Sequence, residues 1–241
     1  MPRKTATSSA FTRAVESAFL PLADAEKAAG MRAYMRGRFH YHGIPTPERR
    51  AAVKLLIRSF APADAAALRT AAHALWQMQE REYHYVAVDL LVHHASALAL
   101  DDLPWLLELV QEKSWWDSVD ALAKVVSKVV RASGAKGRRQ MDRAIRAEDF
   151  WVRRIAMIHQ LGWRGDTDTV RLFEYADRLA HEEEFFIRKA VGWALRDYAW
   201  HDWRAVEKYL KTARTRLSPL SCREAMKNFP ELSGKLRTAR S

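Results

Sequence analysis

The chain has 241 residues, 49% of them hydrophobic and 29% charged, which are the proportions of a globular protein with ample length for a core. One cysteine, Cys222, excludes an intrachain disulfide, and no apolar run has the length of a signal peptide or a membrane span. The formal net charge of +11 favours a polyanionic partner such as nucleic acid, although membranes and acidic proteins also attract basic surfaces. We therefore expect a cytoplasmic protein.

Helical periodicity runs through nearly every segment, and runs of alternating β-branched residues are missing. Two or more helices are expected before a loop at residues 42–45, and Thr46 is expected to cap the helix that Pro47 and Glu48 begin. Further helix starts are predicted after Asp101-Asp102, after Ser114 and at Ser218-Pro219. We expect a single repeat domain over residues 11–232, between a disordered tail (1–10) and a basic tail (233–241).

Three segments of the chain resemble one another. They are WWDSVDALAKVV from Trp115, FWVRRIAMIHQL from Phe150 and FFIRKAVGWALR from Phe185, and their starts are 35 residues apart. A weaker fourth copy, EYHYVAVDLLVH, begins at Glu82. This period is typical of stacked helix pairs of the HEAT or armadillo type, whose concave face commonly binds a partner. We predict an all-α, HEAT-like helical repeat solenoid with a concave basic groove; a non-repeating helical bundle is the alternative.

The aligned segments place four polar or aromatic side chains on one helix face. Counted within each segment, Trp116 is at position 2, Arg154 at 5, Asp120 at 6 and Trp193 at 9. Positions 2, 5, 6 and 9 have the i, i+3, i+4, i+7 spacing of one face, so helices stacked in register would bring the four together. Apolar residues share these positions, so the strip could also border the core.

At these residues the sequence resembles the bacterial AlkD-type DNA alkylation repair family, whose HEAT-like repeats wrap duplex DNA. The resemblance extends from about Ala33 to about Tyr198. The stretches that carry it are AYMRGRFHYHGIPTPERR, EYHYVAVDLL, KSWWDSVDALA, FWVRRIAMIHQL and FFIRKAVGWALRDY. The sequence departs from the family pattern at Gly37, Arg38, His40 and His42, which puts DNA contacts of the first repeat in doubt.

The resemblance implies which residues act on DNA. It implies that Asp120, Trp116 and Trp193 are catalytic and that Arg154 binds phosphate, with Arg153 the less favoured choice. Basic side chains recur at similar repeat positions. We expect them on the phosphate track, the surface along which the DNA phosphates would lie, although a solvated face would also explain them. These side chains are Arg153, Arg188, Lys189 and Arg196.

The family implies a DNA glycosylase that excises N3- and N7-alkylated purines, such as 3-methyladenine and 7-methylguanine, from duplex DNA without flipping the base. We expect a monofunctional enzyme, because no lysine is obviously placed for a Schiff-base lyase step. Such a purine is already cationic and leaves readily, so the enzyme mainly has to stabilise positive charge on the deoxyribose. A carboxylate such as Asp120 can do so and can orient water, while the faces of Trp116 and Trp193 attract the cationic sugar.

Other interpretations of the same residues remain open. Trp116 and Trp193 are also suitable as core residues, and Asp117 is the competing carboxylate, although its place in the first helical turn suits a capping role. At the level of the whole chain, a non-catalytic HEAT-repeat scaffold for damaged or branched DNA is the leading alternative, followed by a protein-binding module.

The sequence indicates neither a metal site nor a nucleotide cofactor. The pairs His93-His94 and His40-x-His42 lack a companion cysteine or a placed carboxylate, and His181 begins HEEE instead of a zinc motif. A phosphate-cradling glycine loop is not visible either. We expect a monomer that acts on double-stranded DNA without metal or cofactor and without a membrane.

Overall fold

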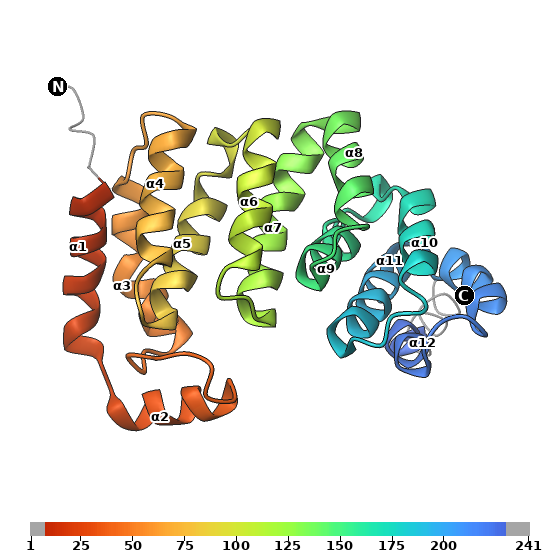
Figure 1. The fold of residues 1–241 in the computed structure, drawn as a ribbon, viewed down its shortest axis with the longest axis horizontal. Helices are drawn as coiled ribbons and strands as arrows, with labels where there is room; N and C mark the ends of the chain where they lie inside the picture. The colour runs from red at the N-terminus through yellow and green to blue at the C-terminus, as the bar shows by residue number, and fades with distance from the viewer. Residues whose placement is uncertain (1–7, 230–241) are drawn as a thin grey trace, which may run out of the picture. The chain divides into compact units, whose positions relative to one another are not determined.

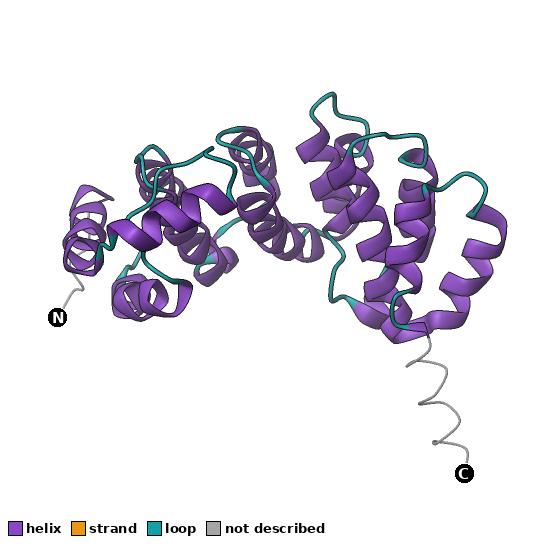
Figure 2. Ribbon diagram, turned by 90° about the horizontal axis from the view of Figure 1, so that it is seen from below, coloured by secondary structure: helices purple, strands orange, loops and turns teal. Residues whose placement is uncertain are grey.

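The computed structural model describes residues 8–229, and the chain falls into two compact units, Met1–Asp102 and Leu103–Ser241. Within residues 8–229 all regular structure is helical, with twelve α-helices, four short 3-10 helices and no strand (Figures 1 and 2). The predicted all-α repeat fold is thereby confirmed. Residues 1–7 and 233–241, expected as tails, lie outside the described residues, and the first helix already begins at Ser8.

The first unit contains α1 (Ser8–Phe19), α2 (Ala25–Tyr34), α3 (Thr46–Ser59), α4 (Ala65–Trp76) and α5 (Arg81–His93) (Figure 1). Helix α1 packs on α3 and α4, and α5 packs on both of these. None of the ten residues of α2 is buried. The expectation that Thr46 caps α3 is wrong: Pro45 has the extended conformation of the N-cap, so Thr46 is already the first helical residue and makes no capping bond.

A buried carboxylate holds the loop between α2 and α3. Glu82 accepts hydrogen bonds from the backbone N–H groups of His42, Gly43 and Ile44 at 3.2, 2.9 and 3.1 Å. Gly43 has φ +87°, and a Cβ there would lie 2.1 Å from the carbonyl oxygen of Asp24. The loop therefore needs glycine at this position, because any side chain would collide with the start of α2.

The second unit contains α6 (Leu103–Gln111), α7 (Trp116–Ala132), α8 (Gly134–Ala144), α9 (Phe150–Ile158), α10 (Thr169–Arg178), α11 (Phe185–Ala213) and α12 (Pro219–Met226). The three aligned segments open α7, α9 and α11, and α9 packs against both of the others. Helices α8 and α10 pack over this layer. As predicted, Ser218 caps the last helix by accepting the N–H of Ser221 at 3.0 Å.

The repeated aromatic pairs have a packing reason. The ring of Trp115 lies 6.0 Å from that of Trp151 and 5.1 Å from that of Phe186, and the rings of Trp151 and Phe186 are 4.9 Å apart. The beginnings of α7, α9 and α11 thus meet in one aromatic cluster. Tilted and edge-on ring pairs at these separations are favourable beyond the apolar area they bury, so the doublets help to set the register of the three helices.

A histidine lies in the core just past the end of α9. His159 is fully buried, its Nδ1 donates to the carbonyl oxygen of Ala156 at 2.6 Å, and its ring lies between those of Trp163 and Tyr175. Its Nε2 has no hydrogen-bond partner within residues 8–229. Burial lowers the pKa of His159 to about 4, because the low-dielectric core disfavours the imidazolium.

The depressed pKa predicts acid sensitivity of the fold. The unfolded chain binds a proton at this histidine near pH 6.5 and the folded chain only near pH 4, so the stability is full above pH 6.5 and is lost as the pH falls towards 4. We expect this residue to lower the free energy of unfolding by about 2 kcal/mol between pH 7 and pH 5.

Urea denaturation at the two pH values checks this prediction. His159→Gln should be less stable than the parent at pH 7 but should lose less stability on acidification. The exposed His181 provides the control, and His181→Gln should keep the parental pH dependence. An equal acid response in the parent and in His159→Gln would contradict the assignment.

Candidate active site

A buried ion pair joins two of the predicted residues. The Nε and Nη2 groups of Arg154 donate to the two carboxylate oxygens of Asp120 at 2.7 and 2.8 Å. This is the bidentate geometry in which an arginine fork matches a carboxylate. The side chain of Arg154 is 5% exposed and that of Asp120 20%, so a buried arginine fixes the orientation of a carboxylate that is partly exposed.

Arg154 also reaches the third helix of the layer. Its Nη1 donates to the carbonyl oxygen of Phe186 in the first turn of α11, and its guanidinium lies 6.0 Å from the ring centre of that residue. Three of the five guanidinium N–H groups are thus occupied by α7 and α11. One side chain on α9 therefore holds all three helices that carry the aligned segments.

Helix caps fix the positions of Arg154 and of its acceptor on α11, the carbonyl oxygen of Phe186. Asp149 accepts the N–H groups of Trp151 and Val152 at 2.8 and 3.0 Å and so begins α9 one turn before Arg154. Glu184 does the same for α11 by accepting the N–H of Phe186 at 3.1 Å. A carboxylate is favoured at a helix N-terminus, because it satisfies N–H groups that lack a partner within the helix.

The two indoles flank the ion pair along the chain. Trp116 is the first residue of α7, one turn before Asp120, and is half-buried. Trp193 is also half-buried and lies seven residues after Phe186 on the same face of α11. Beside it, a Cβ on Gly192 would come within 2.5 Å of the Cβ of Glu224, so only glycine allows α12 to approach α11 this closely.

The other basic residues expected on the phosphate track are each partnered. Arg153 pairs with Glu182 at 2.7 Å, and Arg188 donates to the carbonyl oxygen of Glu182 at 2.8 Å. Lys189 and Arg196 share Glu224, at 2.7 and 2.6 Å. The structure therefore brings Arg154 onto Asp120, and it places the remaining cations at two glutamates that link neighbouring segments of the unit.

Sequence reasoning did not find these glutamates or the carbonyl of Phe186. A signal for Glu224 exists, because Lys189 and Arg196 are seven residues apart and share a face of α11, which suggests a common acid on a neighbouring element. The backbone carbonyl of Phe186 cannot be predicted from the pattern of side chains. It can be identified only once the packing of α9 on α11 is known.

Two of the histidines singled out from the sequence contact other residues of the first unit. His94 approaches the carbonyl oxygen of Ile57 at 3.1 Å, and His42 approaches the hydroxyl of Tyr83 at 2.9 Å. Among residues 8–229 no group of three or more His, Cys, Asp or Glu side chains has an arrangement that could hold a metal ion. In the same range no helix is both long enough and apolar enough to span a membrane.

The ion pair should reveal itself in a double-mutant cycle. Asp120→Leu leaves the buried guanidinium without its counter-charge, and we expect a loss of about 3 kcal/mol in the free energy of unfolding. In the double variant Asp120→Leu/Arg154→Met the stranded charge is gone, so stability should partly recover relative to Asp120→Leu. Denaturation with guanidinium chloride gives the free energy of unfolding of all four members of the cycle. Strictly additive effects of the two substitutions would show that the pair contributes no coupling.

Comparisons with known proteins agree with this architecture. The family model described as "DNA alkylation repair enzyme" matches residues 15–229. A solved structure titled "Predicted DNA alkylation repair enzyme from Enterococcus faecalis" is similar to the chain with a TM-score of 0.77 and 35% sequence identity, covering 85% of this chain and 95% of that one. No curated protein gives a match. The chain belongs to the DNA alkylation repair enzyme family.

Proposed function

We propose that this protein is a monofunctional DNA glycosylase that hydrolyses the N-glycosidic bond of N3- and N7-alkylated purines in duplex DNA. The observation that carries the proposal is the carboxylate of Asp120, which is partly exposed and which Arg154 holds through two hydrogen bonds. Membership of a family named for alkylation repair supports DNA as the substrate. The net charge of +11 is in keeping with a phosphate-rich partner.

The chemistry needs little beyond a well-placed negative charge. An alkylated purine with a positive charge leaves without strong acid catalysis, and cationic charge then develops on the deoxyribose. A preorganised carboxylate stabilises that charge without having to reorient during the reaction, which is the main advantage of a fixed site over water. Asp120 would also orient the attacking water and accept its proton as the water oxygen bonds to the sugar.

The contacts of Arg154 support a role other than direct phosphate binding. Its donors already bind Asp120 and the carbonyl oxygen of Phe186, and only 4% of the residue is exposed. We therefore propose Arg154 as a positioning residue for the carboxylate. Phosphate binding by its two remaining N–H groups would require this buried side chain to become more exposed.

Trp116 and Trp193 would form the walls beside the carboxylate. Both are half-buried, so each indole has an anchored side and an accessible side. The π face of an indole attracts a cation, and each contact with a cationic sugar is worth on the order of 0.5–2 kcal/mol. Approach from the sugar side would leave the base in or near the stack, and we include this absence of base flipping in the proposal on the strength of the family resemblance.

The basic side chains at Glu182 and Glu224 would serve the backbone of the duplex. Arg153, Arg188, Lys189 and Arg196 now hold protein oxygens through part of their N–H groups. The N–H groups that these contacts leave unused would be the ones that bind phosphate oxygens. We propose that the protein carries out this reaction as a monomer.

Substitution of the carboxylate tests the reaction. Asp120→Asn keeps the size of the side chain and one acceptor but removes its charge. Single-turnover release of 7-methylguanine from methylated duplex DNA should fall by at least about 100-fold, while the affinity for the duplex should change little. Asp117→Asn, on the same helix but in its first turn, is the matched control and should excise at close to the parental rate.

The same measurements separate glycosylase from scaffold. A parent protein that binds duplex DNA with a steep salt dependence but releases no base is a non-catalytic DNA-binding scaffold. Undiminished excision by Asp120→Asn, or a larger loss in Asp117→Asn, would overturn the assignment of the catalytic carboxylate. A circular dichroism spectrum of each variant shows whether a loss of activity comes with a loss of fold.

A further inference from the structure

A row of exposed basic side chains lies on α8 of the second unit, outside the three helices that carry the candidate active site. The residues are Lys136, Arg139 and Arg143 on α8 and Arg146 just beyond its end, and all four are exposed. Their spacings of three, four and three residues keep them on one face of the helix. Over ten residues at 1.5 Å each, this basic row is about 15 Å long.

Two of the three acids beside the basic row and its cavity already accept hydrogen bonds from other donors, and Glu174 is the third. Asp142 accepts two hydrogen bonds from Arg171, at 2.8 and 2.9 Å, and a third from the hydroxyl of Tyr175 at 2.7 Å. Asp177 accepts from Tyr209 at 2.9 Å and from Arg216 at 2.7 Å. The row therefore keeps its positive charge beside carboxylates whose lone pairs are largely occupied.

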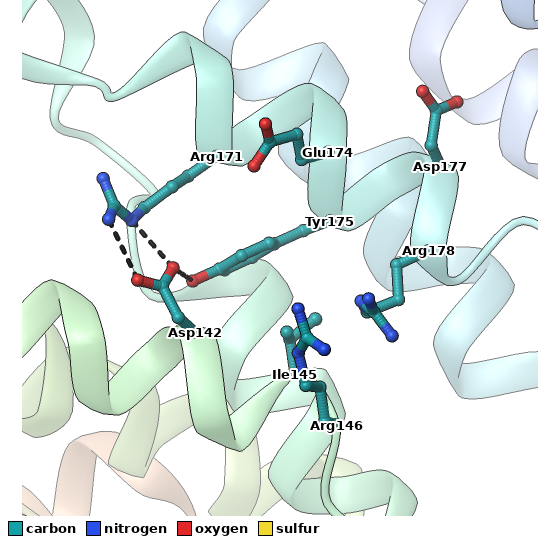
Figure 3. Close-up of a pocket in the computed structure, with 8 residues that line it drawn as sticks. All are labelled: Asp142, Ile145, Arg146, Arg171, Glu174, Tyr175, Asp177 and Arg178. Atoms are coloured by element: carbon teal, nitrogen blue, oxygen red, sulfur yellow. Dashed lines mark hydrogen bonds and ion pairs between the residues drawn. The ribbon is translucent and has the colours of Figure 1, made fainter.

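The end of the row opens into a cavity of about 810 Å³ between α8 and α10. Figure 3 shows the guanidinium groups of Arg146 and Arg178 pointing toward one another beside the ring of Tyr175, while the carboxylate of Asp142 is turned to Arg171. Within residues 8–229 neither Arg146 nor Arg178 has a side-chain hydrogen bond or ion pair. Two guanidinium groups that face each other without an acid between them form a place for an oxyanion, which each could bind through two N–H groups.

We propose that the basic row and Arg178 form a second phosphate-binding surface, which takes the backbone of a DNA segment other than the one at the candidate centre. Helices α7, α9 and α11 carry Trp116, Asp120, Arg154 and Trp193, whereas this surface belongs to α8 and α10. The choice of DNA as the polyanion rests on the proposed function. The binding itself requires no excision chemistry.

The length of the surface favours a nucleic-acid strand over a single small anion. One strand of a duplex carries a phosphate for every 3.4 Å along the helix axis, so a row of about 15 Å faces about four phosphates. The cavity at its end offers a deeper position for one of them. A protein with both surfaces could hold two duplex segments at once, which would help it to transfer between segments while it searches for damage.

Counting bound duplexes tests the proposal. Sedimentation velocity with an excess of a labelled, undamaged 12-base-pair duplex at low salt should give two duplexes per chain for the parent. The variant Arg143→Gln/Arg146→Gln/Arg178→Gln should bind one. The control Arg58→Gln/Lys54→Gln/Arg13→Gln, which removes three exposed cations from α1 and α3, should still bind two.

A fourth variant changes the same cavity in the opposite direction. Glu174 lines it one turn before Arg178, so Glu174→Gln removes a competing negative charge and should tighten the second binding event about threefold to tenfold. A loss of folding cannot imitate such a gain. A single duplex on the parent, or an unchanged stoichiometry in the triple variant at α8 and α10, would overturn the proposal.

The outcome is separate from that of the glycosylase assay. If the parent binds two duplexes but releases no 7-methylguanine, the second surface stands and the proposed function fails. If the triple variant keeps single-turnover excision while losing one duplex, both stand. Competition with inorganic phosphate tests whether the cavity binds a free anion instead of DNA. If millimolar phosphate fully occupies the cavity and no second duplex binds, the proposal is refuted.

Discussion

A charged arginine inside a helical layer has to be neutralised, and the second unit is arranged around that requirement. Arg154 lies on the middle helix of three, and its fork is shared between a carboxylate on α7 and a main-chain oxygen on α11. Removing an ion from water costs several kcal/mol unless partners replace the lost hydration. The three helices must therefore stay close enough for Arg154 to keep its partners. Asp120 is consequently a structural partner of Arg154 as well as the carboxylate that we propose for catalysis.

The aromatic cluster supplies the apolar counterpart of this arrangement. Trp115, Trp151 and Phe186 pack at the beginnings of the same three helices. In the sequence, Trp115 and Trp151 come shortly before the two residues of the ion pair. Rigid rings and a polar grip together leave the carboxylate little freedom. A group that is fixed before the substrate arrives does not lose conformational entropy when it is used, and this property suits a site that works by electrostatic stabilisation.

The sequence predicted the helical class, the three aligned starts and the meeting of Asp120 with Arg154, because all three follow from periodicity: residues with a helical repeat share a face, and repeats with a constant offset stack in register. It did not predict the partners Glu182 and Glu224 or the carbonyl of Phe186. Those contacts depend on how far one helix is displaced against another, which side-chain spacing along a single helix does not encode. The cap at Thr46 failed for a local reason, since the extended Pro45 starts the helix one residue early.

Helix α2 is joined to the first unit at its base, where Glu82 and Gly43 secure the adjoining loop, yet none of its own ten residues is buried. Mutations along it therefore disturb few of the contacts on which folding depends. Selection can then alter the chemistry of this segment at almost no risk to the fold, so the exposed surface of α2 can change while the packed helices of the first unit stay the same.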